Sequence, residues 1–456
     1  MYHALHNKEE GHFCGTERRG KSTPPNKISD ERIEFVKEHI KSFPRVPGHY
    51  TRKDSNREYL GADLNITRMY DLYKQKCAEC KYEPVKSQMY RKIFNEEFNI
   101  SFHIPKKDKC NVCSKYEMAE SDGTLTENMK HNYNLHQKRK AIAREEKDRD
   151  KQESKHQPKL HVCAFDLPAV LYTPCSLVSV MYYMRKLCVY NLSVYSLKNG
   201  DGSCYLWTET NGMRGSSEIA TCLRLYLLAL PTQVEHVILY SDACTGQNRN
   251  QIMASALLHF VTHNRNIKTI DHKFLESGHT QNECDSVHSA VEFAKKKIKI
   301  YVPSQWDTVI TMARRRDPYH VVPLRYSDFL DYKDVKKNQI KVQTNARVKV
   351  SWIQIRHMRF VKDLPDTMLF KNDLRDDFTA IKIARDVKLN EVVPNKYRQR
   401  LPVSAAKKKD LMTLCKNGAI PKDYHEYYKN LPSSATVKDR LPESDVEESD
   451  GDESDN

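Results

Sequence analysis

The chain has 456 residues, of which 39% are apolar and 30% charged, so it is long enough for two or three domains with a substantial core. No apolar run approaches the roughly 18 residues of a membrane span, and the first residues lack a signal-peptide apolar segment, so we expect an intracellular protein without a membrane partner. The net charge of +15 understates how basic most of the chain is, because residues 442–456 are acidic and carry no base. This surplus favours nucleic acid as a partner.

The N-terminal part of the sequence predicts a small helical region after a flexible start. Residues 1–28 are polar and lack hydrophobic periodicity, so we expect them to be flexible. Residues 29–103 then carry three helical patterns, Glu31–Phe43, Asn65–Cys77 and a segment that begins after Ser87. The outer face of the third helix is expected to present polar and basic side chains: Lys86, Gln88, Arg91 and Lys92. Three short helices with a basic last member resemble a helix-turn-helix, which favours contact with DNA.

Cysteines and histidines then cluster with spacings that favour a structural zinc ion. In an intracellular chain the 13 cysteines are expected to be thiols and metal ligands rather than disulfides. Two pairs have the C-x₂-C spacing that lets both thiolates reach one tetrahedral ion. Our first choice of ligands is the second pair with two histidines that follow it: Cys110, Cys113, His131 and His136. The alternatives are the first pair and a preceding histidine: Cys77, Cys80 and His103.

A highly charged segment, Glu127–Glu153, predicts a long helix with few apolar positions. Because charges occupy nearly all of its faces, we expect an exposed helical linker rather than part of a core. Residues 104–157 are therefore assigned to a zinc-binding region followed by this linker.

Residues 158–305 alternate strand and helix patterns. Apolar runs that end at Asp166 and Asp242 predict two buried strands. The other elements expected in this region are strands within Met181–Leu197, Ser203–Thr210 and Ile267–Leu275, and helices Ser217–Leu230, Asn250–His263 and Asn282–Lys299. The order resembles that of a ribonuclease H (RNase H)-like domain, so the predicted fold class is α/β with a mixed five-stranded sheet flanked by helices.

Acidic residues fall where such a sheet would bring carboxylates together. Asp166 and Asp242 each end a strand, and Asp285 and Glu292 share one face of the last helix with His288. Three converging carboxylates suit two Mg²⁺ or Mn²⁺ ions, roughly 4 Å apart, that stabilise the attacking and leaving oxygens at a phosphodiester. Asp285 is our first choice for the third acid and Glu292 its rival, while His288 is either a neighbour of the metals or a surface histidine. Three polar residues beside Asp242 either orient a phosphate or close the turn: Ser241, Gln247 and Asn248.

The remainder of the chain predicts smaller units. Residues 306–376 alternate enough to suggest a small β-containing module with bases that suit a nucleic-acid backbone: Arg347, Lys349, Arg356, Arg359 and Lys362. Residues 377–440 are basic with one short helix, Asp410–Asn417. Their clusters Arg398-Gln-Arg400 and Lys407-Lys-Lys409 indicate nuclear import. Residues 441–456 form an acidic tail that is expected to be disordered.

Several motifs resemble a large group of uncharacterised, transposon-associated animal proteins, and the resemblance covers most of residues 30–300. The N-terminal motifs are His39-Ile-Lys-Ser-Phe-Pro44, His49-Tyr-Thr-Arg52, Leu64-Asn-Ile66, Met69-Tyr70, Tyr90-Arg-Lys-Ile-Phe-Asn95, Phe98-Asn-Ile-Ser-Phe-His103 and Pro105-Lys-Lys-Asp-Lys-Cys110-Asn-Val-Cys113. The central motifs are Tyr240-Ser-Asp-Ala-Cys-Thr-Gly-Gln-Asn248, Gly278-His279 and Glu283-Cys-Asp-Ser-Val-His288.

The central domain of that group is similar to the RNase H-like core of DDE/D transposases. The resemblance implies a DNA nuclease or strand transferase with Asp166, Asp242 and either Asp285 or Glu292 as its acids, and a tendency to form homo-oligomers. Cys284 and His288 resemble a Cys/His motif of some transposases, but their spacing differs, so no metal role is assigned to them on that ground. Two other functions fit the same residues: a domesticated, non-catalytic nuclear DNA-binding protein, and a structure-selective or RNase H-type nuclease.

Overall fold

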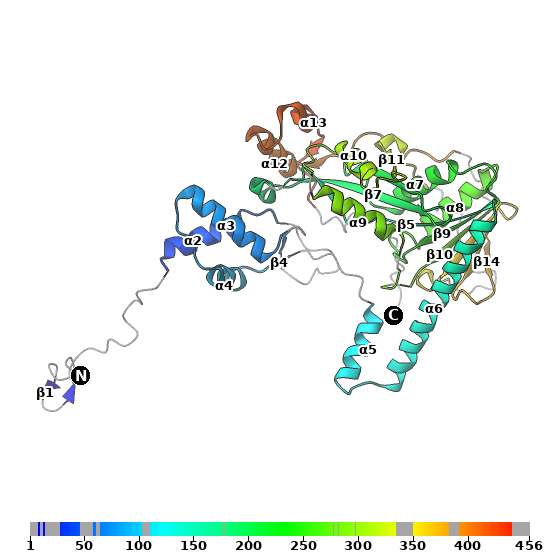
Figure 1. Ribbon diagram of the computed structural model, residues 1–456, viewed down its shortest axis with the longest axis horizontal. Coiled ribbons are helices and arrows are strands. Elements are labelled where there is room, and N and C mark those ends of the chain that lie inside the picture. Colours follow the sequence, from blue (N-terminus) through cyan, green and yellow to red (C-terminus); the bar gives the residue numbers. More distant parts are fainter. Residues whose placement is uncertain are drawn as a thin grey trace. The chain divides into compact units, whose positions relative to one another are not determined.

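The structure is a computed structural model in which the chain forms two compact units (Figure 1). The first unit comprises Met1–Phe43 and Leu64–Ser101, and the second Pro44–Asp63 and Phe102–Asn456. The residues that the structure describes are 8–9, 12–13, 28–45, 58–60, 64–102, 110–176, 178–276, 278–280, 282–296, 298–333, 350–382 and 392–439. The flexible start expected for residues 1–28 lies almost wholly outside them, and so does the whole of the acidic tail.

Three helices make up the core of the first unit: α2 (Asp30–Lys41), α3 (Ile66–Cys80) and α4 (Ser87–Glu97). They confirm the three helices expected from the sequence. The side chains of Ser29 and Asn65 cap the first two helices by accepting bonds from the backbone N–H groups of Arg32 and Arg68. The buried apolar side chains of this unit include the following: Val36, Ile40, Phe43, Met69, Leu72, Tyr73, Tyr90, Ile93 and Phe94. The short strands of the N-terminal part are β1 (Lys8–Glu9), β2 (His12–Phe13), β3 (Glu58–Leu60) and β4 (Ile100–Phe102).

Acidification is expected to destabilise the first unit, because the buried His39 must stay neutral there. Its side chain is 0% exposed, its Nδ1 lies 2.9 Å from the Tyr90 hydroxyl oxygen, and burial lowers its pKa to about 3. In the unfolded chain the imidazole has a pKa near 6.5, so below that pH the unfolded state binds a proton that the folded state excludes. We expect the unit to lose about 2 kcal/mol of stability between pH 7 and pH 5.

Amide hydrogen exchange of α2–α4 at the two pH values, corrected for intrinsic exchange rates, measures this loss. The matched control is His39→Gln, whose neutral amide can still bond to Tyr90. This variant should show no such dependence on pH. An equal loss of protection in His39→Gln would show that His39 is not the titrating group.

The second unit is built on a ten-stranded mixed sheet whose strand order is β11-β8-β7-β5-β9-β10-β12-β13-β14, with β6 paired to β7 (Figure 1). Its strands are β5 (Leu160–Asp166), β6 (Leu171–Thr173), β7 (Leu187–Ser196), β8 (Gly202–Thr208), β9 (His236–Ser241), β10 (Thr269–Phe274), β11 (His320–Pro323), β12 (His357–Val361), β13 (Thr367–Lys371) and β14 (Thr379–Lys382). β5, β9 and β10 run parallel to one another, whereas β7 and β8 are antiparallel neighbours on the other side of β5. The fold class is therefore α/β with a mixed sheet, as expected, but in the described residues the sheet has ten strands where five were expected.

Helices cover both faces of this sheet. Side chains alternate along a strand, so Tyr190 faces one side of β7 and Val189 the other. On the first side lie α7 (Ser216–Leu228) and α8 (Gln251–His263), which share the largest apolar cluster with the sheet. On the second side lie α9 (Cys284–Lys295) and α10 (Gln305–Met312). None of the helices in the described part of the chain is long and apolar enough to cross a membrane.

The long charged helix α6 (Glu127–His156) also packs on the second unit, which corrects the expectation of an exposed linker. It follows α5 (Asn111–Ser121), and the two helices lie side by side as a hairpin (Figure 1). One face of α6 is buried although most of its members are polar: His136, Ile142, Ala143, Lys147, Asp150 and Ser154. The prediction failed because hydrophobic periodicity does not distinguish a charge that is buried with a partner from one in water.

The segments beyond α10 join the same unit. Strands β12, β13 and β14 extend the large sheet through the β10–β12 pairing, so the segment 306–376 contributes to the central sheet instead of forming a sheet of its own. Further along are β15 (Val403–Ser404), β16 (Ser433–Ser434), α12 (Ala405–Lys416) and α13 (His425–Lys429). The 3₁₀ helices are η2 (Ser179–Tyr183), η3 (Tyr326–Asp328), η4 (Trp352–Gln354) and η5 (Lys422–Tyr424).

One basic cluster of this region is partly internal. Lys407 is 7% exposed, and its Nζ donates to both carboxylate oxygens of Glu209 at 2.8 Å. The Nζ of Lys408 donates to the backbone oxygen of Leu431 at 2.6 Å. Two of the three lysines expected to aid nuclear import are thus used to dock α12.

Candidate metal centres

Three carboxylates line one hollow at an edge of the sheet. Asp166 is the last residue of β5, and Asp242 directly follows β9, its parallel neighbour, so both lie at the carboxyl ends of adjacent strands. Asp285 lies in the first turn of α9. All three line a hollow of about 240 Å³, and the other lining residues are Ala243, Cys244, Gly278, Thr280 and Asn282. The structure thus brings together the three residues that the sequence analysis put first, and we call this hollow the acid pocket.

His288 adds a nitrogen to the same place. It lies one helical turn after Asp285, and ligand atoms of Asp166, Asp285 and His288 all lie within 4.8 Å of one another. Its Nδ1 is 3.7 Å from Oδ2 of Asp166, while its buried Nε2 has no hydrogen-bond partner in the described part of the chain. Burial lowers the pKa of His288 to about 4, so the ring is neutral at neutral pH.

Glu292, the rival third acid, has a different environment. Its side chain is 51% exposed, and its Oε1 lies 2.5 Å from the Nζ of Lys295. It is neither among the lining residues of the acid pocket nor in the described Asp/His cluster.

The polar residues beside Asp242 serve the turn itself. Asn248 donates from Nδ2 to Oδ1 of Asp242 at 2.5 Å, and the backbone N–H of Cys244 donates to the same oxygen at 3.3 Å. The hydroxyl of Ser241 donates to the Asp242 backbone oxygen at 2.7 Å, and Gln247 donates to the backbone oxygen of Arg214. The sequence left two roles open for these residues, orienting a phosphate or closing the turn. The contacts fit closure of the turn, in which Asn248 orients the Asp242 carboxylate.

Asn282, which the sequence analysis did not single out, holds the start of α9 against β5. Its Nδ2 donates to the Phe165 backbone oxygen at 3.1 Å, and its Oδ1 accepts from the backbone N–H of Cys284 at 3.1 Å. The Cys284 thiol is buried between the backbone oxygens of Ala164 and Ser193, each 3.4 Å from Sγ. These contacts place Asp285 near the end of β5. The only sequence signal for them is that Asn282 lies three residues before Asp285.

A second cluster contains two cysteines and two histidines. The side chains of Cys110, Cys113, His136 and His279 offer ligand atoms that all lie within 4.8 Å of one another. Sγ of Cys110 is 3.1 Å from Nε2 of His136, and Sγ of Cys113 is 3.2 Å from Nε2 of His279. Three of these residues were expected as zinc ligands, and His279, from the connection between β10 and α9, is new.

The other expected zinc ligands lie elsewhere. His131 is exposed on α6 and does not belong to the cluster. Cys77 and Cys80 lie in the last turns of α3 in the first unit, where Cys77 is buried and Cys80 is exposed. His103 falls outside the residues that the structure describes.

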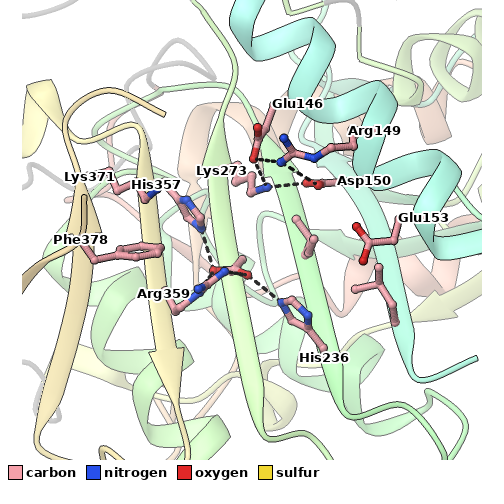
Figure 2. Close-up of a pocket in the computed structure, with 13 residues that line it drawn as sticks. Glu146, Arg149, Asp150, Glu153, His236, Lys273, His357, Arg359, Lys371 and Phe378 are labelled. Carbon is pink, nitrogen blue, oxygen red and sulfur yellow. Dashed lines mark hydrogen bonds and ion pairs between the residues drawn. The ribbon is translucent and has the colours of Figure 1, made fainter. Parts of the chain in front are cut away.

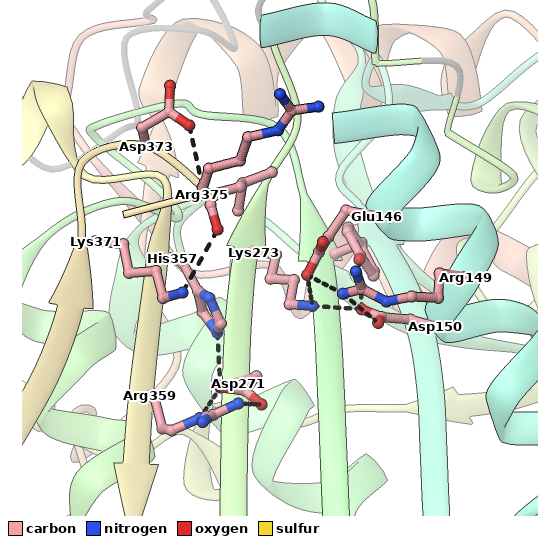
Figure 3. A network of polar contacts seen from close by, with 12 residues as sticks. Glu146, Arg149, Asp150, Asp271, Lys273, His357, Arg359, Lys371, Asp373 and Arg375 are labelled. Carbon is pink, nitrogen blue, oxygen red and sulfur yellow. Dashed lines mark hydrogen bonds and ion pairs between the residues drawn. The ribbon is translucent and has the colours of Figure 1, made fainter. Parts of the chain in front are cut away.

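Polar contacts join β10 to β12 through Asp271 and to α6 through Lys273 (Figures 2 and 3). Asp271, on β10, is 0% exposed and accepts bonds from His236, His357 and Arg359 at 2.7 Å each. These three partners hold the pKa of Asp271 well below its usual value despite its burial. Two residues further on, Lys273 reaches α6, with its Nζ 2.7 Å from Glu146 and 2.5 Å from Asp150.

This network borders a hollow of about 290 Å³, and the ion pairs of Asp271 and Lys273 lie in its lining (Figure 2). The guanidinium of Arg359 also lies 4.6 Å from the ring centre of Phe378. Arg356 pairs with Glu276 at 3.5 Å, and Lys362 donates to the backbone oxygen of Asn264. The described bases that were expected to follow a nucleic-acid backbone therefore have internal partners, while Arg347 and Lys349 lie outside the described residues.

Comparison with known proteins adds no function to these sites. The chain matches no protein-family model and no curated protein. The proposals below therefore rest on the geometry of the acid pocket and of the Cys/His cluster.

Proposed function

We propose that this chain is a metal-dependent phosphodiester nuclease or strand transferase of the transposase type, with DNA as its substrate. The observation that carries the proposal is the convergence of Asp166, Asp242 and Asp285 on one hollow. They come from three elements that are far apart in the sequence and adjacent in space. Chance turn residues would not be expected to meet in this way.

The arrangement of the sheet supports an RNase H-like core. Its central strands lie in the order β8-β7-β5-β9-β10, with antiparallel neighbours on one side of β5 and parallel neighbours on the other. This is the order of a mixed five-stranded RNase H-like sheet, to which β11 and β12–β14 would be additions. Under this interpretation the acids occupy the strand ends and the helix where the sequence analysis expected them.

The donor atoms of the acid pocket fit hard divalent cations. Carboxylate oxygens are the ligands that Mg²⁺ and Mn²⁺ prefer, and Asp166, Asp242 and Asp285 would hold them. The neutral His288, whose Nδ1 lies 3.7 Å from Oδ2 of Asp166, adds a nitrogen donor that Mn²⁺ accepts more readily than Mg²⁺. Bound there, the ions would stabilise negative charge on the attacking and leaving oxygens.

The protein's own residues keep the acids in position for this chemistry. Asn248 donates a hydrogen bond to Oδ1 of Asp242 and so orients the carboxylate. Asn282 ties the start of α9 to β5, so that Asp285 stays beside Asp166. Sites for phosphoryl chemistry need this kind of support, because displacements of about 1 Å can lower rates strongly.

DNA is proposed as the partner on grounds of charge. The chain is basic overall, and the outer face of α4 exposes the side chains that were expected to contact DNA: Lys86, Gln88, Arg91 and Lys92. Nuclear localisation and homo-oligomer formation remain part of the proposal. Arg398, from the cluster expected to aid nuclear import, is exposed.

Nicking of supercoiled plasmid by the full chain in Mn²⁺, with EDTA as the metal-free control, tests the proposal. We expect cleavage that the Asp242→Asn variant loses while its circular dichroism stays unchanged. No cleavage by a folded protein that still binds DNA in a salt-dependent manner would favour the non-catalytic DNA-binding protein. Preferential cleavage of an RNA–DNA hybrid would favour the RNase H-type nuclease.

A further inference from the structure

The distances within the Cys/His cluster suit a tetrahedral zinc site. With Zn–S near 2.3 Å and Zn–N near 2.0 Å, sulfur and nitrogen ligands of one ion lie about 3.5 Å apart. The sulfur–nitrogen distances of 3.1 and 3.2 Å are close to that spacing, and all four ligand atoms lie within 4.8 Å of one another. Two cysteine sulfurs and two imidazoles also bind zinc in preference to hard cations such as Mg²⁺.

The neighbours of these ligands have the arrangement expected around a bound metal. His136 directs Nε2 at Cys110, while its Nδ1 lies 3.4 Å from Oε1 of Glu276. A carboxylate on the far nitrogen is the usual support for a zinc-bound imidazole, since it fixes the tautomer and orients the ring. Gln137 donates to Sγ of Cys113 at 3.3 Å, as expected for a thiolate that needs a hydrogen-bond donor. Glu276 belongs to the same connection as His279.

His279 is also adjacent to the acid pocket. Its two neighbours in the sequence, Gly278 and Thr280, both line that pocket. Gly278 has φ +75°, and a Cβ there would lie 2.7 Å from the backbone of Cys110, so the connection runs directly against the first zinc ligand. The position of His279 is therefore tied through one peptide bond on each side to residues that line the acid pocket.

We propose that a zinc ion bound by Cys110, Cys113, His136 and His279 joins the α5–α6 hairpin to the β10–α9 connection and thereby fixes one wall of the acid pocket. α6 would then contact the β10–α9 connection at two points, at the zinc ion and just before α9. At the far end Lys147 lies 2.5 Å from Glu283, immediately before α9. Zinc binding stands independently of the proposed nuclease, whereas its consequence for cleavage rests on that function.

The metal content of purified full-length protein tests the ligand set. We expect about one zinc per chain, and Co²⁺ substitution should give the absorption of a tetrahedral site with thiolate ligands. His279→Ala should weaken zinc binding by at least about 100-fold, more than loss of an outer partner would. The matched control is His131→Ala, the ligand favoured by sequence spacing, which should bind zinc as the wild type does.

Retention of wild-type zinc affinity by His279→Ala would overturn the proposal. Loss of zinc in His131→Ala would also overturn it. So would purified protein that binds neither Zn²⁺ nor Co²⁺, because the two cysteine–histidine pairs would then be only thiol–imidazole hydrogen bonds. If His279→Ala is poorly folded, the Co²⁺ spectra of the wild type and of His131→Ala together decide the question. Both must then report two thiolate and two nitrogen ligands.

Amide exchange measured without any substrate tests the link to the acid pocket. Removing zinc from the wild type with a chelator should raise exchange in peptides that cover the β10–α9 connection by at least about tenfold. Peptides from β5 and β9 should keep their protection, because the sheet does not depend on the ion. Unchanged exchange in the connection would overturn the coupling, and this readout remains valid even if the protein cleaves no DNA.

Discussion

Replacing Asp285 with asparagine is expected to lower metal-dependent cleavage by about 10³-fold, whereas Glu292→Gln should change it by less than about twofold. Asp285 lines the acid pocket with Asp166 and Asp242, so losing its charge removes an oxygen ligand from the site. Glu292 is half exposed and paired with Lys295. A loss of about 4 kcal/mol of transition-state stabilisation corresponds to the larger effect.

Initial rates of plasmid nicking over a range of Mn²⁺ concentrations measure both variants. The two substitutions are chemically matched and lie on the same helix, so each is the control for the other. If Glu292→Gln abolished cleavage and Asp285→Asn did not, the third carboxylate would be Glu292. Wild-type cleavage in both variants would remove α9 from the proposed metal site.

Replacing Asp271 with alanine is expected to destabilise the second unit by about 3–5 kcal/mol. The carboxylate is 0% exposed and accepts bonds from His236, His357 and Arg359. Removing it leaves the guanidinium of Arg359 partly buried without its anion and loosens β10 from β12. Because its folded pKa lies well below 3.8, this stabilisation is complete at neutral pH and is lost only as the pH falls below about 4.

Urea unfolding followed by circular dichroism measures the change. The control is Glu235→Ala, which removes a carboxylate that also has two cationic partners, Lys159 and Lys268, but whose groups are largely in water. We expect the control to have little effect, as is usual for surface ion pairs. Equal effects of the two substitutions would show that burial does not set the importance of the Asp271 network.

The sequence by itself determined the local elements and the first two acids. Apolar runs that end at Asp166 and Asp242 predicted β5 and β9, and helical patterns predicted α2, α3, α7 and α8. These features are readable because burial against a neighbouring layer imposes a period of two or 3.6 residues on any element. Parallel neighbours then place their carboxyl ends together, so Asp166 and Asp242 were expected to meet.

Only the tertiary structure decided the contacts between distant segments. His279, and not His131, lies with Cys110, Cys113 and His136, because the fold brings it there from a distant segment, whereas sequence spacing favours the nearer histidine. α6 is buried because Asp150 and Lys147 meet opposite charges on β10 and before α9, and such pairing is invisible until the partners are placed. β12 joined the central sheet because edge strands present unpaired backbone groups to any later strand, whatever its sequence.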